Sequence, residues 1–161
     1  MITLVLGGAR SGKSEVAERL AGRLPPPVVY VAMAVIDSDD DLAARVAAHQ
    51  DRRPSDWKTV EPGNDLVGTL RSAPDGTVLV DALGPWVAGH HDFLVDSRSL
   101  VDALTTRNGD AVVVSEEVGL GVHPSTEAGR RFRDALGDVN RAVAEVSDEV
   151  LLVVAGRVLP L

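Results

Sequence analysis

The sequence contains no cysteine, few aromatic residues and no long apolar run. The missing cysteine excludes disulfide bonds and thiolate metal sites, although it leaves the cellular compartment open. Aromatic residues make up only 3% of the chain, so valine, leucine and alanine must fill the interior, a composition that favours buried parallel strands. No apolar run is long enough to cross a bilayer, and no basic leader precedes the first strand. We therefore expect a cytoplasmic chain without a membrane span.

Positive charge is also scarce, because 16 lysine and arginine residues face 24 aspartate and glutamate residues, giving a net charge of −8. A surface that binds duplex nucleic acid needs clustered basic side chains facing the phosphates. The composition therefore argues against nucleic acid as a partner. With 161 residues, 45% of them hydrophobic, the chain suits one domain over residues 1–161 with a substantial core.

The most specific motif is the sequence GGARSGKS, which directly follows an apolar strand predicted over residues 2–6. It fits the phosphate-binding pattern G-x-x-x-x-G-K-[ST] at every fixed position. Gly7 and Gly12 allow the backbone to wrap a polyphosphate closely. Lys13 should place its charge among the outer phosphates, and Ser14 should offer its hydroxyl to Mg²⁺. We therefore expect a nucleoside triphosphate to bind the whole octet: Gly7, Gly8, Ala9, Arg10, Ser11, Gly12, Lys13 and Ser14.

Predicted strands and helices alternate along the rest of the chain. Further strands are predicted over residues 28–32, 57–60, 77–81, 111–115 and 149–155, and helices over 13–24, 42–50, 65–71, 97–106 and 125–146. This alternation predicts an α/β fold of the P-loop NTPase class, with a mostly parallel sheet flanked by helices on both faces. The loops after Leu6, Ala32, Asp81 and Ser115 should then meet at the sheet edge where such folds bind ligands.

Carboxylates at two predicted strand ends are candidates for chemistry. Asp81 ends the strand VLVD, where a Walker-B aspartate would face the phosphate-bound Mg²⁺, usually through water. The alternative is an ordinary loop aspartate or helix cap. Glu116 and Glu117 follow the strand AVVVS, and one of them, with Glu117 as the candidate, could act as a general base. A solvated strand end is the alternative for this pair.

Other polar or aromatic clusters indicate structure more often than function. His90 and His91 are adjacent, so their side chains point apart, and we interpret them as loop residues rather than metal ligands. Trp57 and Trp86 are expected to pack in the core. His49, near the end of a predicted helix, would on spacing alone be an ordinary surface histidine.

The chain resembles the bifunctional adenosylcobinamide kinase/adenosylcobinamide-phosphate guanylyltransferase family of cobalamin biosynthesis. The resemblance rests on four blocks in order: GGARSGKS, AARVAAHQDRRPSDWKTVE, SEEVGLGVHP and RRFRDALGDVNRAVAEVSDEVLLVVAG. It runs almost from end to end and is weakest over residues 83–108. The resemblance implies the RecA-like branch of the P-loop fold and a homotrimer.

By this resemblance, the enzyme phosphorylates the aminopropanol hydroxyl of adenosylcobinamide and then transfers GMP from GTP through a covalent GMP-histidine. The matching histidine is His49, with ATP and GTP as substrates and Mg²⁺ as cofactor. A neutral imidazole is a suitable nucleophile toward a phosphorus that cationic groups activate. Further positions that match nucleotide contacts of the family are Ala32, Met33, Ala34, Gln50, Asp51, Arg52, Arg53, Glu61 and Asp81.

The sequence departs from the family pattern near the expected site. Met33 and Val35 replace polar residues, Glu116 stands where the family has asparagine, and residues 83–89 replace a more polar segment. These departures motivate two alternatives. One is a simple small-molecule P-loop kinase with His49 on the surface, and the other is a nucleotide-binding module with reduced catalysis.

Overall fold

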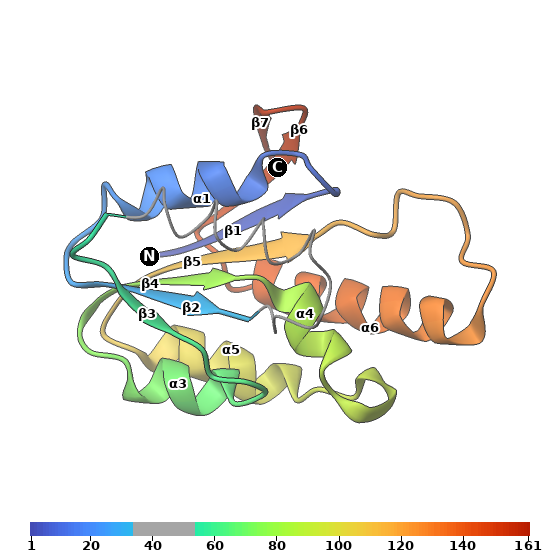
Figure 1. The fold of residues 1–161 in the computed structure, drawn as a ribbon, viewed down its shortest axis with the longest axis horizontal. Coiled ribbons are helices and arrows are strands. Elements are labelled where there is room, and N and C mark those ends of the chain that lie inside the picture. Colours follow the sequence, from blue (N-terminus) through green and yellow to red (C-terminus); the bar gives the residue numbers. More distant parts are fainter. Residues whose placement is uncertain (34–53) are drawn as a thin grey trace.

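Seven strands form one sheet in the order β3-β2-β4-β5-β1-β6-β7 in a computed structural model that describes residues 1–33 and 54–161 (Figure 1). The predicted helix over residues 42–50 lies outside the described residues. The strands are β1 (Ile2–Gly7), β2 (Val28–Ala32), β3 (Lys58–Val60), β4 (Gly76–Asp81), β5 (Gly109–Glu116), β6 (Glu149–Val154) and β7 (Arg157–Pro160). All neighbouring strands pair in parallel except β6 and β7. The predicted α/β fold with a mostly parallel sheet is confirmed.

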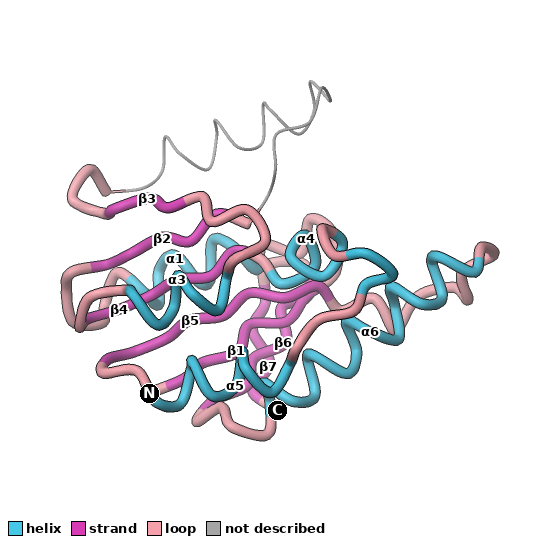
Figure 2. Tube along the Cα trace, turned by 90° about the horizontal axis from the view of Figure 1, so that it is seen from below, coloured by secondary structure: helices cyan, strands magenta, loops and turns pink. Residues whose placement is uncertain are grey.

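Helices cover both faces of the sheet. They are α1 (Lys13–Ala21), α3 (Leu66–Ser72), α4 (Leu83–Ala88), α5 (Ser97–Thr106) and α6 (Glu127–Ala144), with a short 3-10 helix, η1 (His91–Phe93). Helix α1 packs on one face, while α3, α5 and α6 lie side by side along the other, as Figures 1 and 2 show. In the part of the chain that the structure describes, no helix is long and apolar enough to span a bilayer.

The strands build two cores because successive side chains point to opposite faces of the sheet. In β1, Leu4 contributes to the core under α3, α4, α5 and α6, whereas its neighbour Val5 contributes to the core under α1. The predicted apolar stripe of α6 faces the first core, where Leu136, Val139 and Val143 are buried. Every central strand is therefore apolar on both sides, as parallel sheets require.

Helix ends follow local hydrogen bonding. Helix α1 ends at Ala21, three residues earlier than predicted. The backbone N–H groups of Arg23 and Leu24 donate hydrogen bonds to carbonyls three residues back, Leu20 O and Ala21 O, instead of four. Such tightening is common in a last turn. Helix α5 is capped by Asp96, which accepts hydrogen bonds from the backbone and side chain of Ser99, and these bonds lower the pKa of Asp96.

Three of the described elements were not predicted: the short helix η1, helix α4 and strand β7. Helix α4 has the sequence LGPWVA, a weak helix pattern, but it buries Leu83, Trp86 and Val87 against the sheet. Strand β7 follows a tight turn at Ala155 and Gly156, which both have positive φ. Strand β7 pairs antiparallel with β6 and forms the edge of the sheet, so β6 is not an edge strand.

Candidate active site

The turn between β1 and α1 is so tight that its first glycine cannot carry a side chain. A Cβ on Gly7 would lie 2.4 Å from Ser11 Oγ and 2.9 Å from the carbonyl oxygen of Val153. Gly12 has φ of 91°, a conformation that suits glycine. The carbonyl of Ser11 accepts a hydrogen bond from Gly156 N at 2.8 Å, which ties the loop to the β6–β7 turn. The loop is thereby shaped to wrap an anion at the N-terminus of α1.

Asp81 leaves the end of β4 toward this loop. Its Oδ1 accepts a hydrogen bond from Ser14 Oγ at 3.2 Å, and its Oδ2 accepts one from the Tyr30 hydroxyl at 2.5 Å. Tyr30 comes from β2 and is only 2% exposed, so its hydroxyl holds the carboxylate from the core side. Asp81 does not cap α4, because Ala82 occupies that position. The two residues predicted as Mg²⁺ ligands are thus brought together.

The donor set of this pair fits Mg²⁺, which prefers hard oxygen ligands and takes only one or two from protein when phosphates supply others. A serine hydroxyl and a carboxylate oxygen 3.2 Å apart meet that description. Among the described residues, no group of three or more histidine, cysteine, aspartate or glutamate side chains could hold a metal by itself. The geometry therefore suits a metal ion shared with a nucleotide.

Lys13, the lysine of the loop, faces a carboxylate at the end of β5, the strand beside β1 in the sheet. Its Nζ lies 3.6 Å from Glu116 Oε1, with the two side chains 13% and 27% exposed. The other oxygen of Glu116 accepts a hydrogen bond from Gly84 N at 2.9 Å. Its neighbour Glu117 instead bends back to accept a hydrogen bond from Gly119 N at 2.6 Å. The carboxylate beside the lysine is therefore Glu116.

Three more of the predicted nucleotide contacts lie at the same sheet edge. Ala32 ends β2, and Met33 donates its backbone N–H to Asp81 O at 3.0 Å. Glu61 is exposed and directly follows β3, whose last residue pairs with Val31 of β2. The remaining candidates fall in the segment 34–53, outside the described residues: Ala34, Val35, His49, Gln50, Asp51, Arg52, Arg53 and the acidic run over residues 37–41.

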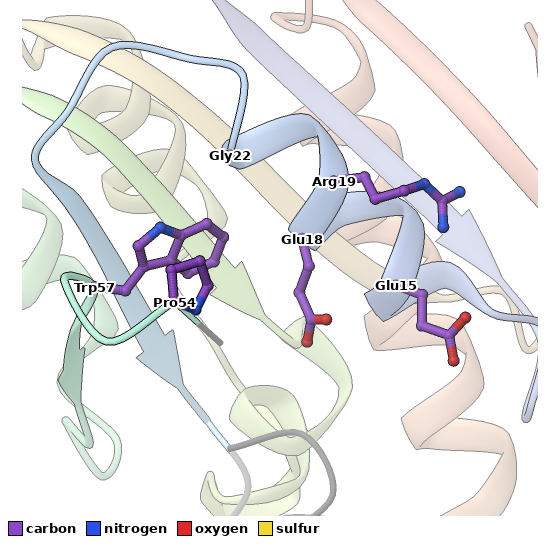
Figure 3. A pocket seen from close by; sticks show the side chains of 6 residues that line it. All are labelled: Glu15, Glu18, Arg19, Gly22, Pro54 and Trp57. Carbon is purple, nitrogen blue, oxygen red and sulfur yellow. The ribbon is translucent and has the colours of Figure 1, made fainter. Parts of the chain in front are cut away.

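Trp57 is partly buried and lines a pocket between α1 and the residues that precede β3. The pocket has a volume of about 440 Å³ and is lined by Glu15, Glu18, Arg19, Gly22, Pro54 and Trp57. In Figure 3, Trp57 and Pro54 lie across from the side chains of α1. Trp86, by contrast, is 3% exposed and donates its indole N–H to Asn64 O, so the core interpretation is confirmed for Trp86, whereas Trp57 is partly buried and packs against the core under α1.

Three site residues escaped sequence analysis. Tyr30 was the one polar side chain in the strand VVYVA, a signal that could have been noticed. Asn140 interrupts the apolar face of α6, is 8% exposed, and donates its amide to Glu116 O at 3.1 Å. No sequence pattern points to Gly84, because its role depends on the space that a missing Cβ leaves for the side chain of Glu116. A Cβ there would lie 2.2 Å from Glu116 Oε2.

The strand, loop and helix of the N-terminus, with Asp81 at the end of β4, define a P-loop nucleotide-binding protein. The fold is similar to that of a prototypical ATPase from the type III secretion system of pathogenic bacteria. The TM-score is 0.51 at 10% sequence identity, over 94% of this chain and 50% of that chain. A likeness at this identity shows the fold alone.

The family follows from sequence comparison. The model of the family "Cobinamide kinase / cobinamide phosphate guanyltransferase" matches residues 3–161. The chain is 39% identical to the bifunctional adenosylcobalamin biosynthesis protein CobP of Pseudomonas aeruginosa, over 100% of this chain and 97% of that protein. It is 37% identical to the bifunctional adenosylcobalamin biosynthesis protein CobU of Salmonella typhimurium, over 97% of both chains. The chain belongs to the cobinamide kinase / cobinamide phosphate guanyltransferase family, whose two reactions take nucleoside triphosphates as substrates.

Replacing Lys13 by alanine should lower the affinity for GTP by about 10- to 150-fold, since a charged hydrogen bond contributes about 1.5–3 kcal/mol. Isothermal titration calorimetry measures this change. The matched control is Lys58→Ala, which removes an exposed lysine from β3 and should leave the affinity unchanged. Equal affinities of the Lys13 variant and the native chain would show that the nucleotide binds elsewhere.

Proposed function

We propose that the chain uses one nucleotide site for two successive reactions of cobalamin biosynthesis. In the first, a phosphoryl group passes from ATP or GTP to the aminopropanol hydroxyl of adenosylcobinamide. In the second, GMP passes from GTP to the new phosphate, giving adenosylcobinamide-GDP. The observation that carries the proposal is the placement of Asp81 and Glu116 beside Ser14 and Lys13 of the loop, in a chain whose family is defined by both reactions.

The phosphates of the nucleotide would lie in the loop over residues 7–14. Lys13 supplies a point charge to the outer phosphates, and the N-terminus of α1 adds the positive end of its dipole. Ser14 and Asp81 would hold Mg²⁺, which when bound neutralises charge on the transferred phosphate and the leaving group. The proposed contacts outside the loop are Ala32, Met33, Ala34, Gln50, Asp51, Arg52, Arg53 and Glu61.

His49 is the proposed nucleophile of the second reaction, on the basis of the family resemblance. Its neutral imidazole nitrogen attacks the α-phosphorus of GTP, so that a P–N bond forms and pyrophosphate leaves with the electron pair of the broken P–O bond. Lys13, and the pair Arg52 and Arg53 that follows His49 in the sequence, would offset the charge on the departing pyrophosphate. A phosphate oxygen of adenosylcobinamide phosphate then attacks the same phosphorus and releases His49.

The histidine step is tested by incubating the chain with α-labelled GTP. We expect protein-bound label that is lost in acid and retained in alkali, as a P–N bond requires, and no label on His49→Ala. The control variant is His91→Ala, because His91 is 93% exposed and should label like the native chain. Label that survives in His49→Ala would remove His49 from the mechanism.

Two other outcomes of the same incubation separate the alternatives. If no label is transferred while adenosylcobinamide phosphate forms from unlabelled nucleotide, the chain is a simple kinase. Nucleotide binding with neither product indicates a module with reduced catalysis.

We also propose that the chain works in the cytoplasm as a homotrimer. Support comes from the family resemblance and from the edge formed by β6, β7 and the residue after β7, where four apolar side chains are 40–75% exposed: Val154, Val158, Leu159 and Leu161. An apolar edge of this kind is usually covered. Sedimentation equilibrium should give three times the mass of one chain, and a monomer at micromolar concentration would contradict the proposal.

A further inference from the structure

We propose that Glu116 is the general base of the kinase step and takes the proton from the hydroxyl group that attacks the γ-phosphorus. This inference rests on the proposed function, because it names the group that activates the acceptor in the first of the two reactions. It concerns a residue at which this chain carries a carboxylate in place of the neutral amide of the family pattern.

The topology brings Glu116 directly to the phosphate site. Strand β5 pairs with β1, and Glu116 is in register with Gly7, the first residue of the loop. Glu116 Oε1 lies 3.6 Å from Lys13 Nζ, the ammonium group that binds the outer phosphates. A carboxylate at that distance can reach a hydroxyl attacking the same phosphate, directly or through one water. The side chain is 27% exposed, so an acceptor can approach it.

One contact holds the carboxylate of Glu116 and another holds its backbone. Gly84 N at the start of α4 donates to Oε2, which leaves Oε1 facing Lys13. The backbone carbonyl of Glu116 accepts a hydrogen bond from the buried amide of Asn140 on α6. A Cβ at position 84 would occupy the space of Oε2, so this arrangement requires the glycine. The carboxylate is therefore preorganised, as a proton acceptor should be.

The carboxylates nearest to Glu116 in the sequence and in the site have other tasks. Asp81 is engaged by Ser14 and Tyr30 in the proposed metal site. Glu117 is turned into its own loop by its bond to Gly119 N. Of these three carboxylates, Glu116 has the position that suits a base.

The proposed step transfers the γ-phosphoryl group to the acceptor and one proton to Glu116. The hydroxyl oxygen of the acceptor forms a bond to the γ-phosphorus, and the bond from that phosphorus to the bridging oxygen breaks. The nucleoside diphosphate leaves with the electron pair of that bond. The hydroxyl proton passes to Glu116, which becomes a neutral carboxylic acid and later releases the proton to water.

The test compares the two reactions of one protein. Guanylyl transfer adds GMP to a phosphate, which carries no hydroxyl proton that must be removed near neutral pH, so it should not need the base. We expect Glu116→Gln to lower kcat for phosphorylation of adenosylcobinamide by about 10²- to 10⁴-fold. The kcat for guanylyl transfer to adenosylcobinamide phosphate should stay within a factor of about three, which also shows that the variant folds.

A second variant acts on the same carboxylate without removing it. Gly84→Ala places a methyl group where Oε2 lies, and only the flexible end of Glu116 has to move. It should lower the kinase kcat more than the guanylyl-transfer kcat. The control Glu149→Gln makes the same chemical change at an exposed glutamate of β6 and should leave both rates unchanged.

Several results would overturn the proposal. If Glu116→Gln lowers only the KM for the nucleotide, the carboxylate merely competes with phosphates for Lys13. If Glu117→Gln, rather than Glu116→Gln, loses the kinase step, the base is Glu117. Equal losses in both reactions would indicate a structural role. A native chain that transfers GMP but forms no adenosylcobinamide phosphate would refute the kinase half of the proposed function as well, whereas the preceding results leave that function intact.

Discussion

The site depends on the close contact between the end of β1 and the loop that follows it. At Gly7 the backbone passes so near to Ser11 and to the carbonyl of Val153 that a side chain is excluded. This turn places Lys13 at the first position of α1, and Ser14 one residue later. A methyl group at Gly7 would clash with Ser11 of the loop and with the β6 carbonyl, so the placement of Lys13 and Ser14 relative to Asp81 and Glu116 depends on this missing Cβ.

The parallel sheet places the carboxylates of the site next to the loop. Strand β1 is central, with β5 beside it and β4 beyond, so the carboxylates at the ends of β4 and β5 reach the same edge. Tyr30 on β2 fixes Asp81, and Gly84 on α4 fixes Glu116. The two carboxylates thus have separate partners. Asp81 pairs with the serine of the loop, while Glu116 faces the lysine, where charge develops during phosphoryl transfer.

Sequence analysis predicted the features that depend on local pattern. The loop, the parallel strands and the pairing of Ser14 with Asp81 followed from residue types and strand order. It missed α4, because glycine and proline within six residues oppose a helix that only burial of Trp86 and its neighbours stabilises. It also named Glu117 as the base candidate, which stays a prediction, because sequence spacing cannot tell which of two adjacent carboxylates turns toward the lysine. In the structure Glu116 faces Lys13, with its other carboxylate oxygen bound to Gly84 N of α4.

The central claim is that the loop over residues 7–14 holds the nucleotide phosphates between Lys13 and the Ser14–Asp81 pair. A crystal structure of the chain with Mg²⁺ and a non-hydrolysable GTP analogue tests it most directly. The account predicts outer phosphates hydrogen-bonded to backbone N–H groups of the loop and to Lys13 Nζ, with the metal between Ser14 and Asp81. Phosphates bound at another surface, with Lys13 still paired to Glu116 and the loop empty, would contradict it.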